Sequence, residues 1–289
     1  MNISSKLWQK NVILLLLIIL PQVAWLTPNQ DVKGKIFTSL EEALKNPENV
    51  TRLYLNGRKL QELSPEIGKL YNLQELNLID NQLISLPAEI AQLKKLKNLY
   101  LQFNQFTELP AVVAELKNLQ YLGISNNFLV RLPAALAQLK KLTGLDLRAN
   151  KLRTLPDTFA CMQRLVTLNL DNNLFAELPN CVTQMRNLKM LEMKNNRLKS
   201  LPASIQNLKN LLILDMGHNK IKEVPASLSK LNKLVFLYLN QNKLTNLPDC
   251  VLHLKKLKQL HLKHNAIQIT AHQKKALRFI PQVDIVPTK

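Results

Sequence analysis

The sequence predicts a solenoid of the α/β class: a horseshoe-like stack of units with a concave parallel β-sheet, short 3₁₀ or irregular segments on the convex side, and a helical cap at each end. Three observations predict it. An apolar residue opens a new unit every 23 residues, from Val50 to Leu257, with no insertion or deletion. An asparagine recurs at one place in the unit, and a Leu-Pro pair closes most units. A repeat of this period is typical of stacked units that contact only their neighbours, and not of a globule with a closed core.

Each unit contains one short predicted strand. The spacing L-x-x-L-x-L-x-x-N-x-L-x-x-L-P runs from Leu73 to Pro87 in the second unit. Within x-L-x-L-x, alternate side chains point to opposite faces, so the leucines face the core and the other residues line the concave sheet. Neighbouring strands lie about 4.8 Å apart, and equivalent outward residues therefore form columns across that face.

The recurring asparagine is predicted to be structural. The chain turns there towards the convex side and leaves backbone donors and acceptors buried, and an amide side chain can satisfy both kinds of group. The first unit has Arg58 at this place, as expected for a terminal repeat that is less buried. The asparagines are Asn81, Asn104, Asn127, Asn150, Asn173, Asn196, Asn219, Asn242 and Asn265.

The Leu-Pro pair predicts where each unit leaves its extended conformation. Proline cannot donate a backbone hydrogen bond, so Leu86–Pro87 and its equivalents stop the chain from pairing as a strand. The segment that follows, such as 88–93, is too short for a full α-helix and predicts a 3₁₀ helix or a single turn. The first unit carries Ser64–Pro65 instead.

Both ends carry a predicted cap. Ser39 followed by Glu42 has the spacing of a helix capping box, and Thr270 followed by Gln273 has it again. Such caps cover leucines that an open solenoid end would expose. The cap residues expected to face the core are Ile36, Phe37, Leu40, Leu44, Ala276, Phe279 and Ile280, with a last extended segment at 283–285.

The N-terminus predicts a secretory signal. Lys6 and Lys10 precede an apolar run, Val12–Leu20, and the small residue Ala24 follows. The run is shorter than the roughly 20 apolar residues of a membrane span. An uncleaved anchor that extends to Leu26 is the alternative. The predicted divisions are a signal peptide at 1–24, a linker and cap helix at 25–49, ten repeats at 50–269 and a C-terminal cap at 270–289.

The 23-residue unit with its Leu-Pro pair resembles the leucine-rich repeat of bacterial leucine-rich repeat proteins and of intracellular Ras-pathway scaffolds. The segment from Phe37 to Leu55, FTSLEEALKNPENVTRLYL, resembles the N-terminal cap of exported bacterial members. The resemblance implies a binding protein of the cell envelope or exterior. It transfers no catalytic residue.

Nothing in the sequence predicts chemistry. Three cysteines, Cys161, Cys181 and Cys250, are too few and too scattered for a disulfide framework and are expected as free thiols on the convex side. His261 and His264 are close in sequence, but they point in different directions and no carboxylate or thiol completes a metal site. Phosphate loops, nucleophile elbows and paired catalytic carboxylates are also missing. We therefore expect no enzyme, cofactor, metal or small-molecule substrate.

The outward columns of the sheet predict a protein contact surface. An apolar strip and an aromatic cluster are expected to be exposed there and to anchor a partner. The apolar strip consists of Met190, Ile213, Phe236 and Tyr238. The aromatic cluster consists of Tyr100, Phe103 and Tyr121, with Ile79 beside it. Isolated exposed apolar residues are common and need no function, which is the alternative.

Between these two patches the concave floor carries a carboxylate row. Arg148, Asp171 and Lys194 alternate in sign along one column. A self-paired, solvated ladder is therefore at least as well favoured as a cation site. The row consists of Asp146, Asp171, Glu192 and Asp215.

The chain is strongly basic, with 39 Lys and Arg against 20 Asp and Glu and a net charge of +19. Many cations fall just before the strands, which we call the leading edge, and others follow the asparagines of the C-terminal half, the trailing edge. Such a field attracts polyanions, although lysine at these turns also simply confers solubility. The leading-edge candidates for polyanion contact are Lys94, Lys95, Lys140, Lys141, Lys255 and Lys256. The trailing-edge cations are Lys151, Arg153, Arg197, Lys199, Lys220, Lys222 and Lys243.

The sequence thus predicts an exported, non-enzymatic module, secreted or in the cell envelope, that binds a protein on its concave face. One alternative is adhesion to anionic glycan or lipid through the basic edges, which would weaken with salt. Another is an intracellular scaffold with an N-terminal membrane anchor. Specific nucleic-acid recognition is not expected for an exported chain with an acidic concave floor.

Overall fold

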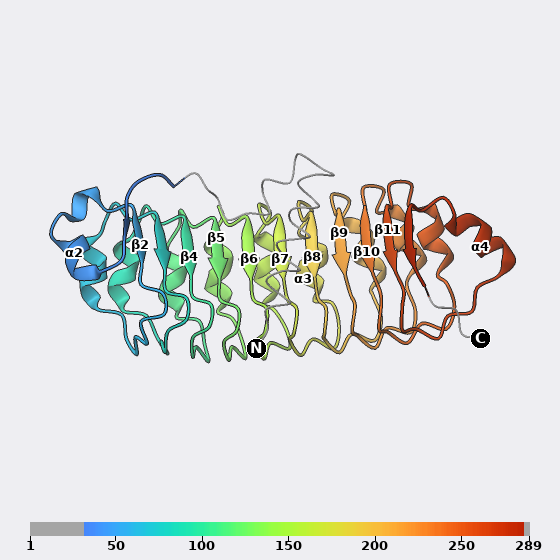
Figure 1. Cartoon of the computed structure of the whole chain (residues 1–289), viewed down its shortest axis with the longest axis horizontal. Coiled ribbons are helices and arrows are strands. Elements are labelled where there is room, and N and C mark those ends of the chain that lie inside the picture. Colours follow the sequence, from blue (N-terminus) through green and yellow to red (C-terminus); the bar gives the residue numbers. More distant parts are fainter. Residues whose placement is uncertain (1–31, 286–289) are drawn as a thin grey trace.

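The computed structural model describes residues 32–285, so the predicted signal peptide and residues 286–289 lie outside the described range. Twelve described strands form one open parallel sheet in sequence order. They stand in a row between α2 (Leu40–Leu44) and α4 (Ala271–Leu277) in Figure 1. This is the predicted solenoid. The strands are β1 (Ile36–Phe37), β2 (Arg52–Tyr54), β3 (Glu75–Asn77), β4 (Asn98–Tyr100), β5 (Tyr121–Gly123), β6 (Gly144–Asp146), β7 (Thr167–Asn169), β8 (Met190–Glu192), β9 (Ile213–Asp215), β10 (Phe236–Tyr238), β11 (Gln259–His261) and β12 (Gln282–Asp284).

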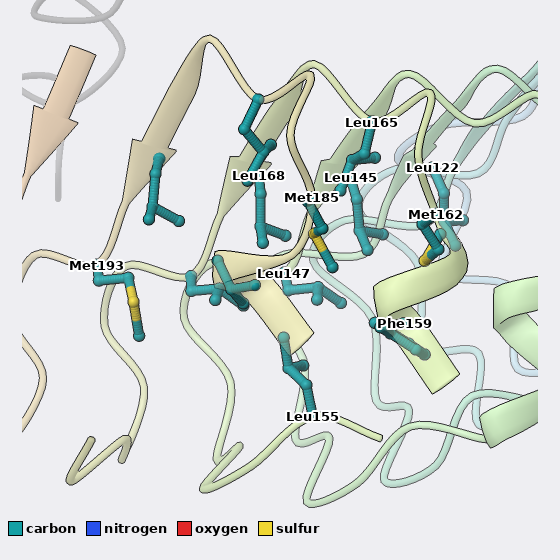
Figure 2. Packing of buried hydrophobic residues seen from close by; sticks show 14 of the residues in the cluster. Leu122, Leu145, Leu147, Leu155, Phe159, Met162, Leu165, Leu168, Met185 and Met193 are labelled. Atoms are coloured by element: carbon teal, nitrogen blue, oxygen red, sulfur yellow. The ribbon is translucent and has the colours of Figure 1, made fainter. Parts of the chain in front are cut away.

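The strand register follows the period of the sequence. Leu145 in β6 lies opposite Leu168 in β7, with Gly144 opposite Thr167. The central leucine of each strand from β2 to β11 points behind the sheet, where Phe159 and Met162 from the convex side pack against the leucine layers (Figure 2). Burying one leucine side chain stabilises the fold by about 1.5–3 kcal/mol, and every unit repeats this contribution.

One short helix per unit forms most of the convex side, as predicted. A proline precedes each of these segments in the regular repeats, where its fixed φ suits the start of a helix and its missing N–H costs nothing. A single α-turn, α3 (Asn180–Thr183), replaces the 3₁₀ helix in one unit. The 3₁₀ helices are η2 (Pro47–Asn49), η3 (Pro65–Lys69), η4 (Ala88–Gln92), η5 (Ala111–Glu115), η6 (Ala134–Gln138), η7 (Asp157–Cys161), η8 (Ala203–Asn207), η9 (Ala226–Lys230) and η10 (Asp249–His253).

The asparagine ladder has the structural role that the sequence predicts. The Asn150 amide donates to the carbonyls of Ile124 and Leu147, both at 3.0 Å, and its oxygen accepts the backbone N–H of Leu129 at 2.9 Å. In the first unit the backbone N–H of Arg58 donates to the Asn81 side-chain oxygen at 3.1 Å. Each asparagine therefore ties its own turn to the unit that precedes it.

The residue before each asparagine has a left-handed backbone conformation, a feature that was not predicted from the sequence. Its φ is 55° at Asn126 and 59° at Asp80, values that Asn and Asp tolerate. The same conformation occurs at Phe103, with φ 56°, and at Ala149, with φ 53°. Phe103 therefore lies in the turn that follows β4 and not in a strand column.

The N-terminal cap forms as predicted, with two differences. The Ser39 hydroxyl accepts the backbone N–H of Glu42 at 3.3 Å, but the Glu42 carboxylate pairs with Lys35 at 2.8 Å and does not complete the box. Ile36 is 39% exposed, so its expected place in the core is wrong. Side chains alternate along β1, and Phe37 is the one that packs against the core.

At the other end, Thr270 and Gln273 form a complete capping box, with reciprocal bonds of 3.0 and 3.2 Å. Phe279 is 85% exposed, so its predicted core position is wrong. The helix ends at Leu277, and the helical spacing that would turn Phe279 inwards does not continue past it. Leu277 is buried in its place, and β12 closes the sheet. Within the described range, every helix is too short or too polar to cross a bilayer.

Candidate functional site on the concave face

The apolar strip is contiguous, but it is less accessible than the sequence suggests. Ile213 and Phe236 are each 3% exposed and pack with Val235, so the expectation that they are exposed is wrong. Large side chains in successive strands cover one another because the strands lie only about 4.8 Å apart. Met190 and Tyr238 remain half-buried at the margins of this cluster.

Tyr238 extends the strip towards the C-terminal cap. Its ring stacks on the imidazole of His261, with the ring centroids 4.7 Å apart and the planes at 12°. The Nδ1 atom of His261 lies 2.9 Å from the Asp284 carboxylate in β12. His261 is thus held by an aromatic ring and a carboxylate and does not join a metal-binding set. No group of three or more His, Cys, Asp or Glu in residues 32–285 has the arrangement of a metal site.

The structure brings Tyr100 and Tyr121 together. Their ring centroids lie 5.3 Å apart and the ring planes are tilted by 41°. A Cβ atom at Gly144 would lie only 2.8 Å from Cδ2 of Tyr121, so the missing side chain of Gly144 leaves room for this ring. Phe103, the third predicted member of the aromatic cluster, is 47% exposed in the turn at the sheet margin.

A polar network that was not predicted from the sequence lies beside these tyrosines. The Tyr54 hydroxyl donates to the Glu75 carboxylate, and the Arg52 guanidinium donates to the Tyr54 oxygen at 2.7 Å. The Asn98 amide donates to the second Glu75 oxygen at 3.2 Å. Tyr54 stands two periods before Tyr100 in the same column, which is the signal that could have identified it. Burial raises the pKa of the Tyr100 hydroxyl well above its ordinary value, so the hydroxyl stays neutral.

The carboxylate row is buried, so the predicted solvated ladder is wrong, and three of its members accept hydrogen bonds from neutral donors. Asp171, Glu192 and Asp215 are 8%, 6% and 3% exposed. The Asn169 amide donates to Glu192 at 2.6 Å, the backbone N–H of Gly217 to Asp215 at 2.9 Å, and that of Lys194 to Asp171 at 2.7 Å. These bonds hold the side chains close to the sheet, where they brace the backbone.

Burial also changes the charge of this row. It raises the pKa of Glu192 to about 8, with a further contribution from the neighbouring Asp215 carboxylate. It raises the pKa of Asp215 to about 6. Glu192 is therefore mainly protonated at neutral pH, and the middle of the concave face is less acidic than its composition suggests.

Two of the leading-edge candidates contact amides. Lys95 donates to the side-chain oxygen of Asn72 at 2.7 Å, and Lys141 donates to that of Asn118 at 2.6 Å. No carboxylate of the described residues lies within ion-pair distance of the leading-edge candidates, which are Lys94, Lys95, Lys140, Lys141, Lys255 and Lys256. Their charge is thus available to solvent or to an anion.

Two family profiles match the chain. One is described as a leucine-rich repeat region and matches residues 112–195 and 180–278, and the other is described as a leucine rich repeat and matches residues 48–106. No curated protein matches the sequence.

Solved structures share the fold. A leucine-rich repeat protein of Leptospira interrogans is 31% identical, with a TM-score of 0.68 over 89% of this chain and 83% of that one. The leucine-rich repeat ectodomain of the plant membrane receptor kinase GASSHO1/SCHENGEN3 from Arabidopsis thaliana, in complex with CASPARIAN STRIP INTEGRITY FACTOR 2, is 27% identical, with a TM-score of 0.66 over 82% of this chain and 32% of that one. The functional domain of InlJ from Listeria monocytogenes is 23% identical, with a TM-score of 0.67 over 88% of this chain and 57% of that one.

The profiles match well over half of the chain, and the Leptospira protein exceeds 30% identity over most of both chains. Proteins with this fold are typically non-enzymatic, and the fold implies a module for protein–protein interaction. The chain belongs to the leucine-rich repeat family.

Proposed function

We propose that this protein is an exported, non-enzymatic module that binds a protein partner on its concave face. One observation carries the proposal: Tyr100 and Tyr121 lie together towards one end of that face and stay partly exposed, with the exposed Phe103 in the turn that follows β4. The Arabidopsis ectodomain, which has the same fold, was solved in complex with CASPARIAN STRIP INTEGRITY FACTOR 2. That complex supports a protein ligand in general and does not identify one for this chain.

Aromatic anchors are well suited to this task. Tyrosine and phenylalanine each bury about 150–250 Å² on contact, and rings of this kind are enriched among interface residues that contribute most to binding. The Tyr121 ring already rests on Gly144, so a partner would immobilise little that is free. At the other end of the face, Met190 and Tyr238 would make the contact, with Ile213 and Phe236 packed beside them.

The test replaces Tyr100 and Tyr238 with alanine, singly and together. Partner protein captured by the wild-type chain from the surrounding medium is purified, and its affinity for each variant is measured by biolayer interferometry. Each truncation should cost at least about 2 kcal/mol, or roughly 30-fold in Kd, if the side chain is a true anchor. Tyr71→Ala is the matched control, since Tyr71 is 51% exposed and lies at the leading edge. Wild-type affinity in both folded anchor variants would place the site elsewhere.

Export is tested separately, by N-terminal sequencing of the mature protein from cell fractions. Cleavage near Ala24 with release from the cell supports the proposal. An intact Met1 in an intracellular membrane fraction favours the anchored scaffold instead.

A second candidate function is adhesion to anionic glycan or lipid through the leading edge. Two pockets at or beside this edge are lined by lysines and amides without a carboxylate, a donor set that suits sulfate or phosphate groups. The first is lined by Gln74, Lys95, Lys97, Asn118, Gln120 and Lys141. The second is lined by Gln206, Asn207, Lys209, Lys230, Asn232 and Lys233. Binding to phosphatidylglycerol vesicles and to heparin should weaken steeply with salt, and an affinity insensitive to ionic strength removes this candidate.

A further inference from the structure

The trailing edge is a second hydrogen-bonded ladder that runs the length of the solenoid. The backbone N–H of Lys151 donates to the Leu129 carbonyl, and that of Lys220 donates to the Leu198 carbonyl, both at 2.8 Å. Successive turns are therefore locked in register. The core leucine of each turn, such as Leu152, is buried, and the residues on either side of it point outwards as two columns.

Before the basic units, these columns carry exposed apolar side chains. Phe128 and Val130 are 46% and 53% exposed, although Leu129 between them is completely buried. Ile84, two units earlier, is 64% exposed. In this turn the buried leucine packs in the core, and the exposed side chains on either side of it do not. Exposed apolar patches of this kind mark contact surfaces.

The same columns become basic in the next unit and stay mostly basic towards the C-terminus. Lys151 joins the two parts, because its Nζ atom lies 5.0 Å from the centroid of the Phe128 ring. Leu174 and Ala176 interrupt the basic run in one unit. No ion pair within the described range involves any of these cations, which are Lys151, Arg153, Arg197, Lys199, Lys220, Lys222 and Lys243.

The positive charge is densest over two neighbouring units. Four cations form a grid there, with units about 4.8 Å apart. Two carboxylates of the same edge, Glu177 and Glu223, lie near this grid, while Glu108 is already held by Arg131 at 2.6 Å. The four neighbouring cations repel one another, and a bound anionic partner would reduce this repulsion. The grid consists of Arg197, Lys199, Lys220 and Lys222.

We propose that the trailing edge docks an acidic polypeptide segment that also carries apolar side chains. The apolar side chains would cover Phe128 and Val130, and the acidic residues would follow the edge to Lys220 and Lys222. Four units separate these two ends, roughly 19 Å, a distance that an extended peptide covers in about six residues. A sulfated glycan or a nucleic acid would satisfy the cations but would leave the apolar side chains in water. This surface is separate from the concave anchors, so the proposal stands or falls independently of them.

The test uses a synthetic fluorescein-labelled peptide with a leucine and phenylalanine block followed by six glutamates, and a scrambled peptide of the same composition. Fluorescence anisotropy against the intact protein should show the block peptide binding several-fold more tightly than the scrambled one. The quadruple variant Arg197→Gln, Lys199→Gln, Lys220→Gln, Lys222→Gln should weaken the block peptide by about tenfold or more at low salt. The matched control removes four leading-edge charges, with Lys140→Gln, Lys141→Gln, Lys255→Gln and Lys256→Gln, and should have a much smaller effect.

A second variant isolates the apolar end. Phe128→Ser with Val130→Ser removes only half-exposed side chains, so the fold should survive, and the preference for the block peptide should disappear while hexaglutamate binding remains. If both quadruple charge variants lost the same affinity for the block peptide, the attraction would be nonspecific and the proposal would be wrong. Equal binding of block and scrambled peptides would also overturn the proposal, as would stronger binding of dextran sulfate that depends on the same four cations.

Discussion

The neighbours that decide what a single residue does lie 23 positions away along the chain. Glu192 stands between Asn169 and Asp215 in adjacent strands, receives a hydrogen bond from the first and the repulsion of the second, and is buried by both. An acidic side chain on a sheet surface would ordinarily be charged and solvated. Here it is buried beside another carboxylate, so the Glu192 carboxyl group keeps its proton in the folded protein at neutral pH.

Glu192→Gln should therefore change how stability depends on pH. The pKa of Glu192 rises from 4.5 to about 8 on folding, so the folded state holds a proton that the unfolded state releases. That difference destabilises the fold progressively as pH rises from the unfolded value towards the folded one. Glutamine keeps an oxygen for the Asn169 amide but cannot ionise. The Tm of Glu192→Gln should match that of the wild type near about pH 4 and exceed it at about pH 8.5.

The measurement is thermal unfolding followed by circular dichroism across this pH range. Glu177→Gln serves as the control, since Glu177 is exposed on the trailing edge and should leave the pH profile unchanged. Asp215, whose pKa is about 6 in the fold, will retain part of the wild-type slope. Parallel profiles for Glu192→Gln and the wild type would show that Glu192 is ionised in the folded protein at neutral pH.

Among the elements, the turn that follows each strand contributes most to the constant register of neighbouring units. A single amide satisfies three backbone groups from two adjacent units, and the left-handed residue before it directs the chain out of the sheet. Because the strands are at most three residues long, their own ladder bonds are few. The asparagine turn supplies much of the hydrogen bonding that keeps neighbouring units in register.

Asn150→Ala should thus be strongly destabilising for a polar substitution. It would leave the buried carbonyls of Ile124 and Leu147 and the N–H of Leu129 without this partner, at a cost of about 2–4 kcal/mol. Urea unfolding monitored by circular dichroism measures the change. Gln105→Ala, an exposed amide in the turn beside Asn104, should stay within about 0.5 kcal/mol of the wild type. Equal effects of the two substitutions would remove the special role of the ladder.

The elements could be predicted because their signals are local and repeated. Leucine, asparagine and Leu-Pro each act within one unit, and the structure follows them from β2 to β11. Accessibility could not be predicted in the same way. Ile213 and Phe236 face outwards as their strand positions require, yet side chains in adjacent units bury them. Phe279 is exposed because its helix stops two residues earlier, and such endpoints are poorly marked in sequence.

On the scale of the whole molecule, stability is approximately a sum of interfaces between neighbouring units. No unit contacts a distant one through a shared centre, so length is adjustable as long as the period is kept. The tyrosine, carboxylate and apolar parts of the concave face are different residue choices at equivalent positions of one scaffold. For that reason the sequence predicts the scaffold well and its ligand poorly.

Deletion of residues 142–164 should yield a shorter, folded solenoid, because Leu165 would then take the place of Leu142 and every column would continue in register. Deletion of residues 142–163 removes one residue fewer and shifts the following strand so that its leucines face the wrong side. The first protein should keep a cooperative transition at a moderately lower Tm. The second should lose cooperativity and become sensitive to limited proteolysis at the junction. Comparable behaviour of both would argue against strict registration.

All three cysteines are free, with Cys161 exposed and Cys181 and Cys250 buried in the convex segments. The main chain is therefore the only covalent connection between the repeat units, and no disulfide joins one of them to the next. If the molecule were pulled from both ends, its units should unfold one at a time from a terminus. Each unfolded unit would lengthen the chain by at most about 80 Å. The protein would therefore extend gradually under force, and the unfolded units could refold onto the remaining folded units when the force falls.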